Sequence, residues 1–443
     1  MAELQSAGEV TIEELLLYTS NGTLIDLRPF IAEINIYEDI FKHFIHGDIL
    51  ISDSINLIKN GPVVGQEILL TKITTPTFPV SIQKDFVIYK ISERVAQSET
   101  TQKYSLSFAS KEVIRDVNLP LYKSFSGFPH NIAKKIYFDF VASKRNYKIS
   151  NDNAVEKGSN FTNFSILNTT SNKIKFVSPG WSPFKCINWL ASKSIPKNEK
   201  AKNFIFFENN KSFVFGSVEK LFDIADKAGD DGKGTYFYGS ASNIRKSKFA
   251  PDINREMFMV KSVNFVENID YLNLYDNGYF SNRMLTVDVY NKKVSYNDYN
   301  YIKEYPNQTH TSGSSSAPRP VFGERTLTNP ASFTSFYPVN PKLFDNFPGN
   351  VSEKMGDIFG NRRSSLLDLS NIKLNIIVPG RTDLQVGSMI DFLMPDLTPN
   401  GRERIRSKDE FYSGKYLITA IHHNIKAGYH FMSMEIIKDS LTS

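Results

Sequence analysis

Short segments in which apolar and polar residues alternate dominate the first 115 residues of the chain. The clearest are residues 33–37 and 104–108, and three further candidates are residues 48–52, 67–74 and 86–95. Because successive side chains of a strand point to opposite faces, this period of two predicts strands that bury one face. Such short strands at hairpin spacing favour an antiparallel β-barrel or sandwich, which we expect to occupy residues 1–115.

The pattern changes to a period near four after Pro129. Ile132, Ile136 and Phe140 are spaced four residues apart and predict an amphipathic helix. Ser182 followed by Pro183 is a typical helix start, and the next residues predict its buried stripe: Phe184, Ile187, Leu190 and Ala191. A Phe-rich hairpin over residues 203–216 comes next. We therefore expect residues 116–250 to form a small α+β domain inserted into a β-rich chain.

Strand patterns return in the last third of the chain. Two candidates lie in residues 251–300, at 257–267 and 280–290, and further ones lie in residues 368–443. Together they make about six strands, as in the N-terminal set, so we expect a second barrel built from these two stretches. Residues 301–367 are polar, with many serines and prolines, and are expected to form an irregular arm or insertion. The expected fold class is mainly β (α+β): two similar antiparallel β-barrels, an inserted α+β domain and a long irregular segment.

The composition excludes several classes of protein. The single cysteine, Cys186, rules out an internal disulfide and any cysteine-based zinc or iron–sulfur site. The net charge of +5 is a weaker basic bias than a dedicated nucleic-acid binder normally has. No apolar run approaches the roughly 20 residues of a membrane helix, and the N-terminal residues lack a signal-peptide pattern. We expect a soluble protein made in a reducing cytoplasm, without membrane insertion.

Two pairs of histidines are candidate metal ligands. His43 and His46 are three residues apart, but their segment is short and apolar residues surround them, which favours packing or hydrogen bonding. His422 and His423 are adjacent in a predicted strand, so their side chains must point to opposite faces and cannot readily chelate one ion.

The remaining candidates for chemistry have structural interpretations. Asp230, Asp231 and Gly232 lack the oxygen donors that a calcium loop has at the preceding positions, which favours a surface turn. Cys186 lies within the apolar stripe of its predicted helix, where a thiol acts as a small apolar residue. We expect a protein that is not an enzyme, with no catalytic, cofactor-binding or metal-binding residues.

Four stretches of the sequence carry a resemblance when they are read in order. They are residues 31–58 with 65–69, residues 179–192, residues 271–290, and residues 378–387 with 414–423. Together they resemble the baseplate hub protein of contractile-tailed bacteriophages, a family related to the hub portion of type VI secretion spike proteins. The resemblance covers nearly the whole chain except residues 301–367. It implies two tube barrels in each chain, with the inserted domain between them.

The resemblance implies a structural virion protein. It would be a trimeric baseplate hub that links the sixfold tail tube to the threefold central spike and lines the DNA channel. Its partners would be two further copies, a spike protein on one face, tail-tube or tube-initiator proteins on the other, and wedge proteins of the baseplate. It would lie in the virion tail after assembly in the host cytoplasm. Two alternatives stay open: a tail-associated hydrolase and a receptor-binding β-protein.

DNA would pass through the lumen of such a ring without specific binding. A cationic lumen would hold phosphates and slow ejection, so we expect a neutral to acidic lumen with basic clusters on the outer surface. The clusters concerned are Arg245, Lys246 and Lys248, and Arg402, Arg404, Arg406 and Lys408.

Overall fold

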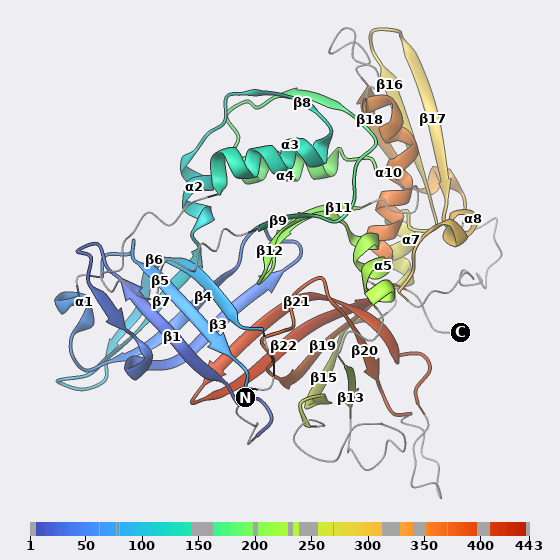
Figure 1. The fold of residues 1–443 in the computed structure, drawn as a ribbon. Helices are drawn as coiled ribbons and strands as arrows, with labels where there is room; N and C mark the ends of the chain where they lie inside the picture. Colours follow the sequence, from blue (N-terminus) through green and yellow to red (C-terminus); the bar gives the residue numbers. More distant parts are fainter. Residues whose placement is uncertain are drawn as a thin grey trace, which may run out of the picture.

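A computed structural model describes most of the chain. The described residues are 6–61, 63–76, 78, 80–142, 163–197, 203–228, 234–238, 256–268, 270–311, 328–339, 351–369, 371–396 and 408–439. Figure 1 shows a large β-sheet in the lower part of the view and two smaller lobes above it. The expectation of a mainly β protein with added α+β parts is confirmed.

The first half of the large sheet contains seven strands: β1 (Thr11–Tyr18), β2 (Leu24–Asp26), β3 (Ile31–Asp39), β4 (His46–Asp53), β5 (Ile68–Thr74), β6 (Ile82–Ala96) and β7 (Gln102–Ser110). Their spatial order is β2-β1-β5-β6-β7-β4-β3, and each neighbouring pair is antiparallel. Their inward side chains form one apolar core, in which Leu15, Ile49 and Phe108 are fully buried. Two short helical turns, η1 (Arg28–Phe30) and α1 (Leu57–Asn60), lie in the connections. The N-terminal strands that the period-two pattern predicts are thus confirmed.

The second half contains β13 (Thr235–Tyr238), β14 (Met259–Val260), β15 (Ser262–Asn268), β19 (Ile372–Pro379), β20 (Met389–Leu393), β21 (Gly414–Lys426) and β22 (Tyr429–Lys438). Their order is β13-β20-β21-β22-β19-β15, and β14, which leads into β15, pairs with β13. The pairs of β13 with β14 and with β20 are parallel, and the others are antiparallel. Leu374, Ile418 and Met434 are fully buried in the core of this half.

The two halves share one strand order. Position by position, β1, β5, β6, β7, β4 and β3 correspond to β13, β20, β21, β22, β19 and β15. Only the first strand differs in direction, because β13 is parallel to β20 whereas β1 is antiparallel to β5. The expectation of two similar antiparallel β-barrels is confirmed for the antiparallel strands, but neither half closes into a barrel within the described residues. The outer edge of β3 bonds to β21 instead of staying open, so one 14-stranded sheet runs through both halves.

The sixth strand of the second half is not the one that the sequence pattern suggests. Residues 280–290 do contain a strand, β16 (Ser281–Asp288), but it pairs with β17 (Lys293–Asn300) and β18 (Thr334–Val339) in a separate sheet. Its expected place is taken by β13, which lies inside the segment assigned to the inserted domain. Alternation identifies a strand and its buried face, but it does not identify the sheet that the strand joins. The short turn after β16 favours pairing with its neighbour β17.

The first lobe is the inserted α+β part. Its elements are α2 (Glu112–Asn118), β8 (Ser124–Gly127), α3 (Pro129–Ile136), η2 (Tyr137–Val141), β9 (Asn163–Ile166), β10 (Ile174–Val177), α4 (Pro183–Ser192), β11 (Phe204–Glu208), β12 (Ser212–Ser217) and α5 (Val218–Ala228). The hydroxyl of Ser182 caps α4 by accepting a hydrogen bond from the N–H of Lys185 at 3.4 Å. Both predicted helices and the Phe-rich hairpin are confirmed, and α3 ends in a single π-helical turn, η2.

The second lobe corrects the expectation of an irregular segment over residues 301–367. Besides β16, β17 and β18, it contains α7 (Tyr271–Asp276), α8 (Tyr301–Glu304), η4 (Tyr305–Asn307), η5 (Pro330–Ser332) and the long helix α10 (Val351–Asp368). α10 packs closely on its sheet: a Cβ added to Gly360 would lie 2.6 Å from the Cβ of Tyr299 and 2.6 Å from the amide oxygen of Asn282. Glycine inside a helix lowers its propensity, so Gly360 weakens the local sequence signal for α10.

The two lobes contact one another as well as the sheet. The guanidinium group of Arg362 in α10 donates hydrogen bonds to the carbonyl oxygens of Ser192 and Ser194, at the end of α4. Next to it, the ammonium group of Lys193 lies 2.9 Å from the hydroxyl of Tyr337 in β18. The lobes are therefore joined by polar contacts on the same side of the sheet (Figure 1).

Candidate functional site

The junction between β3 and β21 joins the two halves of the sheet. Residues 34–39 of β3 run antiparallel to residues 420–425 of β21. On one face, the side-chain oxygen of Asn35 accepts a hydrogen bond of 2.8 Å from the amide of Asn424, and its amide donates one of 3.1 Å to Asp48 of β4. Backbone pairing and side-chain hydrogen bonds thus connect three adjacent strands from both ends of the chain.

The adjacent histidines of β21 lie on opposite faces of this junction, as the strand pattern predicts. His422 stacks on Tyr37 of β3, with 4.5 Å between the ring centres. His423 is fully buried on the other face, where its Nδ1 lies 3.0 Å from Nε2 of His430 and its Nε2 lies 3.6 Å from a carboxylate oxygen of Glu38. Burial, followed by the charge of His423, lowers the pKa of His430 well below its usual value. His422 and His423 therefore belong to separate contacts and do not chelate one ion.

The histidines near the start of β4 are also separated. Nδ1 of His43 lies 3.2 Å from the carbonyl oxygen of Phe206 in the first lobe, and the two rings stack with 5.6 Å between their centres. His46 stacks instead on Tyr37, with 5.3 Å between the ring centres, and burial lowers the pKa of its imidazole. Each histidine packs against a neighbouring ring in a different part of the molecule.

Cys186 is buried in α4, as the apolar stripe predicts. Its Sγ lies 3.2 Å from the hydroxyl oxygen of Ser178, and burial raises the pKa of the thiol. The thiol is thus protonated at neutral pH and shielded from solvent, which makes it a packing residue. Asp230, Asp231 and Gly232 lie outside the described residues. So do the members of both basic clusters except Lys408, which is exposed.

A buried ion pair fixes the first lobe to the first half of the sheet. The ammonium group of Lys84 in β6 lies 2.5 Å from a carboxylate oxygen of Glu208 in β11, and both side chains are buried. The other carboxylate oxygen accepts hydrogen bonds from the hydroxyl of Ser110 at 2.5 Å and from the N–H of Ile45 at 2.8 Å. One carboxylate of the lobe therefore holds three separate segments of the sheet half.

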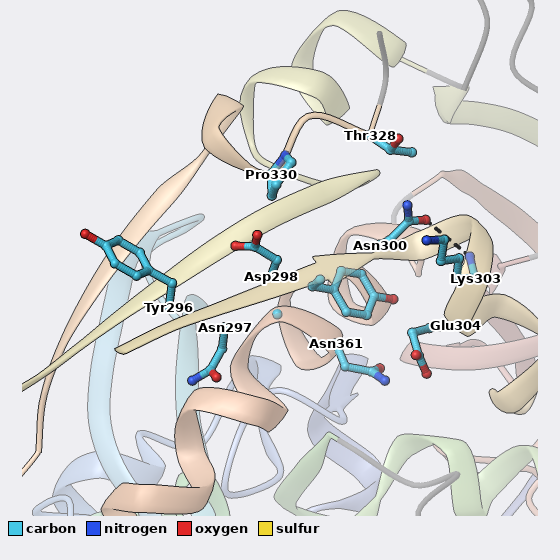
Figure 2. Close-up of a pocket in the computed structure, with 11 residues that line it drawn as sticks. Tyr296, Asn297, Asp298, Asn300, Lys303, Glu304, Thr328, Pro330 and Asn361 are labelled. Carbon is cyan, nitrogen blue, oxygen red and sulfur yellow. Dashed lines mark hydrogen bonds between the residues drawn. The ribbon is translucent and has the colours of Figure 1, made fainter. Parts of the chain in front are cut away.

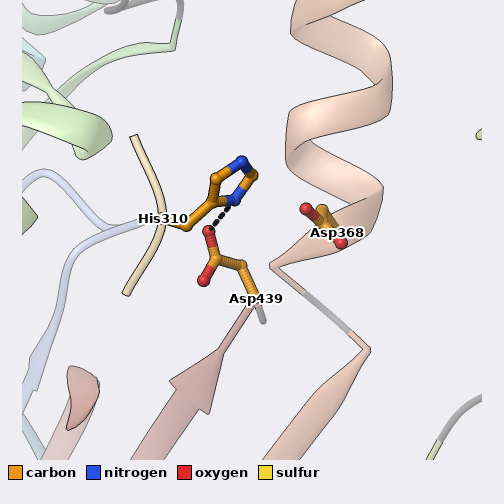
Figure 3. A group of neighbouring side chains, drawn as sticks. All are labelled: His310, Asp368 and Asp439. Atoms are coloured by element: carbon orange, nitrogen blue, oxygen red, sulfur yellow. Dashed lines mark hydrogen bonds and ion pairs between the residues drawn. The ribbon is translucent and has the colours of Figure 1, made fainter. Parts of the chain in front are cut away.

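A buried cluster lies between the second lobe and the end of β22, and sequence reasoning missed it. Figure 3 shows His310, Asp368 and Asp439 facing one another, with possible ligand atoms that lie within 4.8 Å. Nδ1 of His310 lies 3.1 Å from Asp439, and its Nε2 lies 3.0 Å from the carbonyl oxygen of Tyr305. A carboxylate and a carbonyl only accept hydrogen bonds, so both ring nitrogens must donate. The ring is then a cation without a lone pair for a metal, and the cluster is an ion pair.

The pKa values of the cluster follow from burial and from this ion pair. Burial, followed by the charge of Asp439, raises the pKa of Asp368 to about 7. Asp368 also accepts hydrogen bonds from the hydroxyls of Tyr279 at 2.6 Å and Tyr301 at 3.0 Å. Burial opposes the charged form of His310, but the hydrogen bond and charge of Asp439 outweigh it and raise the pKa of the imidazole. Burial likewise opposes the ionised form of Asp439, but His310 holds the pKa of that carboxyl below its usual value.

A polar pocket of about 720 Å³ lies beside β17 and α10 (Figure 2). The carboxylate of Asp298 in this pocket forms an ion pair with Arg283 of the neighbouring strand, with an N–O distance of 2.6 Å. The side chain of Asn300 caps α8 by accepting a hydrogen bond of 3.2 Å from the N–H of Lys303. These contacts stabilise a sheet surface and a helix start, and we assign the pocket no ligand.

Comparison with known proteins places the fold. No protein-family model matches the chain, and no curated protein matches it in sequence. Among solved structures, the tail protein from Neisseria meningitidis MC58 aligns over 97% of this chain and 97% of its own, with 11% identity and a TM-score of 0.52. The 43 kDa tail protein of prophage MuSo2 from Shewanella oneidensis aligns over 97% of this chain and 99% of its own, with 10% identity and a TM-score of 0.50. The chain has the fold of these tail proteins.

A weaker match is a component of the type VI secretion system of E. coli. It aligns over 98% of this chain and 77% of its own, with 8% identity and a TM-score of 0.43. The resemblance inferred from the four sequence stretches is confirmed at the level of fold by the tail protein from Neisseria meningitidis and the tail protein of prophage MuSo2. Within the described residues, no helix has the length and apolar character that crossing a membrane requires.

Proposed function

We propose that this protein is the hub of a phage tail baseplate and that it acts as a trimer. The observation that carries the proposal is the shared strand order of the two halves of its sheet. Three chains with two similar halves each supply 3 × 2 = 6 similar units, which is the number that a sixfold tail tube presents. A protein of this kind joins a ring of six to a spike with threefold symmetry.

The position of the lobes supports this assignment. Both lobes lie on one side of the sheet, and each occurs once per chain (Figure 1). In a trimer, the sheet side would present six similar units, whereas the lobe side would present three. The sheet side would then contact tail-tube or tube-initiator proteins, and the lobe side would contact the spike. Wedge proteins of the baseplate would bind outside, and DNA would pass through the lumen without specific contacts.

The role is structural rather than enzymatic. The solved structures from Neisseria meningitidis and Shewanella oneidensis are both tail proteins, and their similarity extends over nearly the whole chain. This favours a structural part of the virion tail over a tail-associated hydrolase or a receptor-binding β-protein. The protein would be assembled into the tail in the host cytoplasm.

The molar mass and symmetry of the purified protein test the proposal. Light scattering during gel filtration should give three times the chain mass of 50.3 kDa, about 151 kDa. Electron microscopy down the ring axis should show six similar densities in the sheet layer and three in the lobe layer. Co-expression with a spike protein should yield a stable complex. A monomer at all concentrations, or a homohexamer, contradicts the proposal.

A further inference from the structure

We propose that the trimer closes by strand pairing between neighbouring chains, with the outer edge of β15 bonded to the second half of β6 in the next chain. This inference rests on the proposed function and specifies its interface. The template for the contact lies within the chain: β3 of the first half pairs with the second half of β21. The strands that correspond to β3 and β21 are β15 and β6, and they belong to opposite halves.

The two hairpin strands β6 and β21 change partners at the same point. The N–H of Ile88 in β6 donates a hydrogen bond of 2.9 Å to the carbonyl oxygen of Glu67, just before β5. In the same way, the N–H of Ile418 in β21 donates one of 2.9 Å to the carbonyl oxygen of Ser388, just before β20. A bulge follows Ile88 in β6 and Ile418 in β21. Beyond the bulge, the edge of β21 is covered by β3, whereas no described strand pairs with that edge of β6.

β6 and β21 differ in burial beyond their bulges, because β21 has β3 as a partner there and β6 has no described partner. Beyond its bulge, β21 has four buried residues: Thr419, Ile421, His423 and Ile425. In the matching segment of β6, residues 89–96, none is buried, and Tyr89 and Val95 are 55% and 60% exposed. β15 shows the same contrast with β3: Phe265 and Val266 are 39% and 44% exposed, whereas three residues of β3 are buried. Open strand edges with exposed apolar side chains are unusual unless a partner covers them.

The register of the contact can be transferred residue by residue. In the first half, the strand register pairs Asn35 of β3 with Asp48 of β4. Asp48 is paired in turn with Ser107 of β7, and Ser107 with Lys90 of β6. In the second half, the register pairs Asn264 of β15 with Asn375 of β19. Asn375 is paired in turn with Glu435 of β22, and Glu435 with Ala420 of β21. Lys90 and Ala420 both follow the bulge of their strand, so Asn264 occupies the position of Asn35.

The residue of β6 that faces Asn264 follows from the same alignment. Asn35 faces Asn424, which pairs with Phe431, four residues before Glu435 in β22. The matching residue of β6 is Val95, because it pairs with Lys103, four residues before Ser107 in β7. Asn264 of one chain therefore lies opposite Val95 of the next. Three junctions within chains and three between chains would then close a ring of six units.

Engineered cysteines test this register, because the native Cys186 is buried and does not interfere. Residues opposite one another in an antiparallel sheet have Cα atoms about 4.5–5.5 Å apart, which a disulfide can span. The double variant Val95→Cys with Asn264→Cys should give disulfide-linked dimers and trimers on a non-reducing gel. A mixture of the two single variants should give dimers only. Asn35→Cys with Asn424→Cys is the matched positive control, because these residues face one another within the chain.

A second variant keeps the test independent of cross-linking chemistry. Val266→Glu should weaken the trimer at least tenfold, because it places a charge on the proposed edge. Val289→Glu is the matched control, since Val289 is 71% exposed at the end of β16, away from this edge. A trimer that resists Val266→Glu and forms no Val95–Asn264 disulfide, while the internal control cross-links, overturns the edge pairing but leaves the hub. A monomer under all conditions overturns both.

Discussion

Replacing Glu208 tests the contact that holds the first lobe on the sheet. In Glu208→Ala, the buried ammonium group of Lys84 loses the carboxylate oxygen at 2.5 Å. The hydroxyl of Ser110 and the N–H of Ile45 lose their acceptor as well. Breaking a buried ion pair by removing one partner costs about 3–5 kcal/mol, because the other charge stays buried and uncompensated. We expect a loss of about 4 kcal/mol in the free energy of unfolding, roughly a thousandfold in the equilibrium constant.

Tryptophan fluorescence during urea unfolding measures this loss of unfolding free energy in the first lobe. The chain has 2 tryptophans, Trp181 and Trp189, and both belong to the first lobe, so their emission reports on its unfolding. Glu13→Ala is the matched control: Glu13 also lies 2.5 Å from a lysine, Lys72, but both side chains are partly exposed. Such exposed pairs contribute about 0–1 kcal/mol. The reasoning is refuted if Glu208→Ala and Glu13→Ala differ by less than about 1 kcal/mol.

Three further predictions follow from the second lobe and from α4. Because the folded state binds the protons of Asp368 and His310 more tightly than the unfolded chain does, the contribution of these two groups to stability should fall as the pH rises from about 5 to 8. The lowered pKa values of His46 and His430 act in the opposite sense as the pH rises toward 6.5, so the contribution of Asp368 is measured against a variant. Urea midpoints of the wild type and of Asp368→Asn measure this contribution: the wild-type midpoint should fall relative to that of the variant as the pH rises, and a difference that does not change with pH contradicts the assignment. Gly360→Ala should lower the melting temperature of the lobe by thermal circular dichroism, because the clash with Tyr299 outweighs the roughly 1 kcal/mol that alanine adds to a helix. A rise would show that α10 can shift. The Cys186 thiol should react with Ellman's reagent only after unfolding, and rapid reaction of the native protein would contradict its burial.

The features that the sequence predicts well are those with local signals. The helix after Ser182 carries its cap and its apolar stripe within ten residues, and the N-terminal strands carry their alternation. The features it misses depend on distant partners. His310 and Asp439 are 129 residues apart, and neither has a neighbour in sequence that marks the pair. β13 has only 4 residues, and its position in the sheet depends on pairing with β20. α10 packs so closely against β17 that it has space only for a glycine at position 360. The positions of these elements depend on packing between segments that are distant in sequence, and a local sequence pattern carries no information about such packing.

The connection between β3 and β4 is only residues 40–45, whereas the matching connection between β15 and β19 covers residues 269–371. The second lobe is therefore an insertion at one point of an otherwise duplicated scaffold. Another domain inserted at this point would leave the order of the strands unchanged, so the proposed trimer could bind a different partner at its lobe side with the same ring of strands. The matching loop of the first half is not open to such an insertion, because His43 and Ile45 within it contact the first lobe.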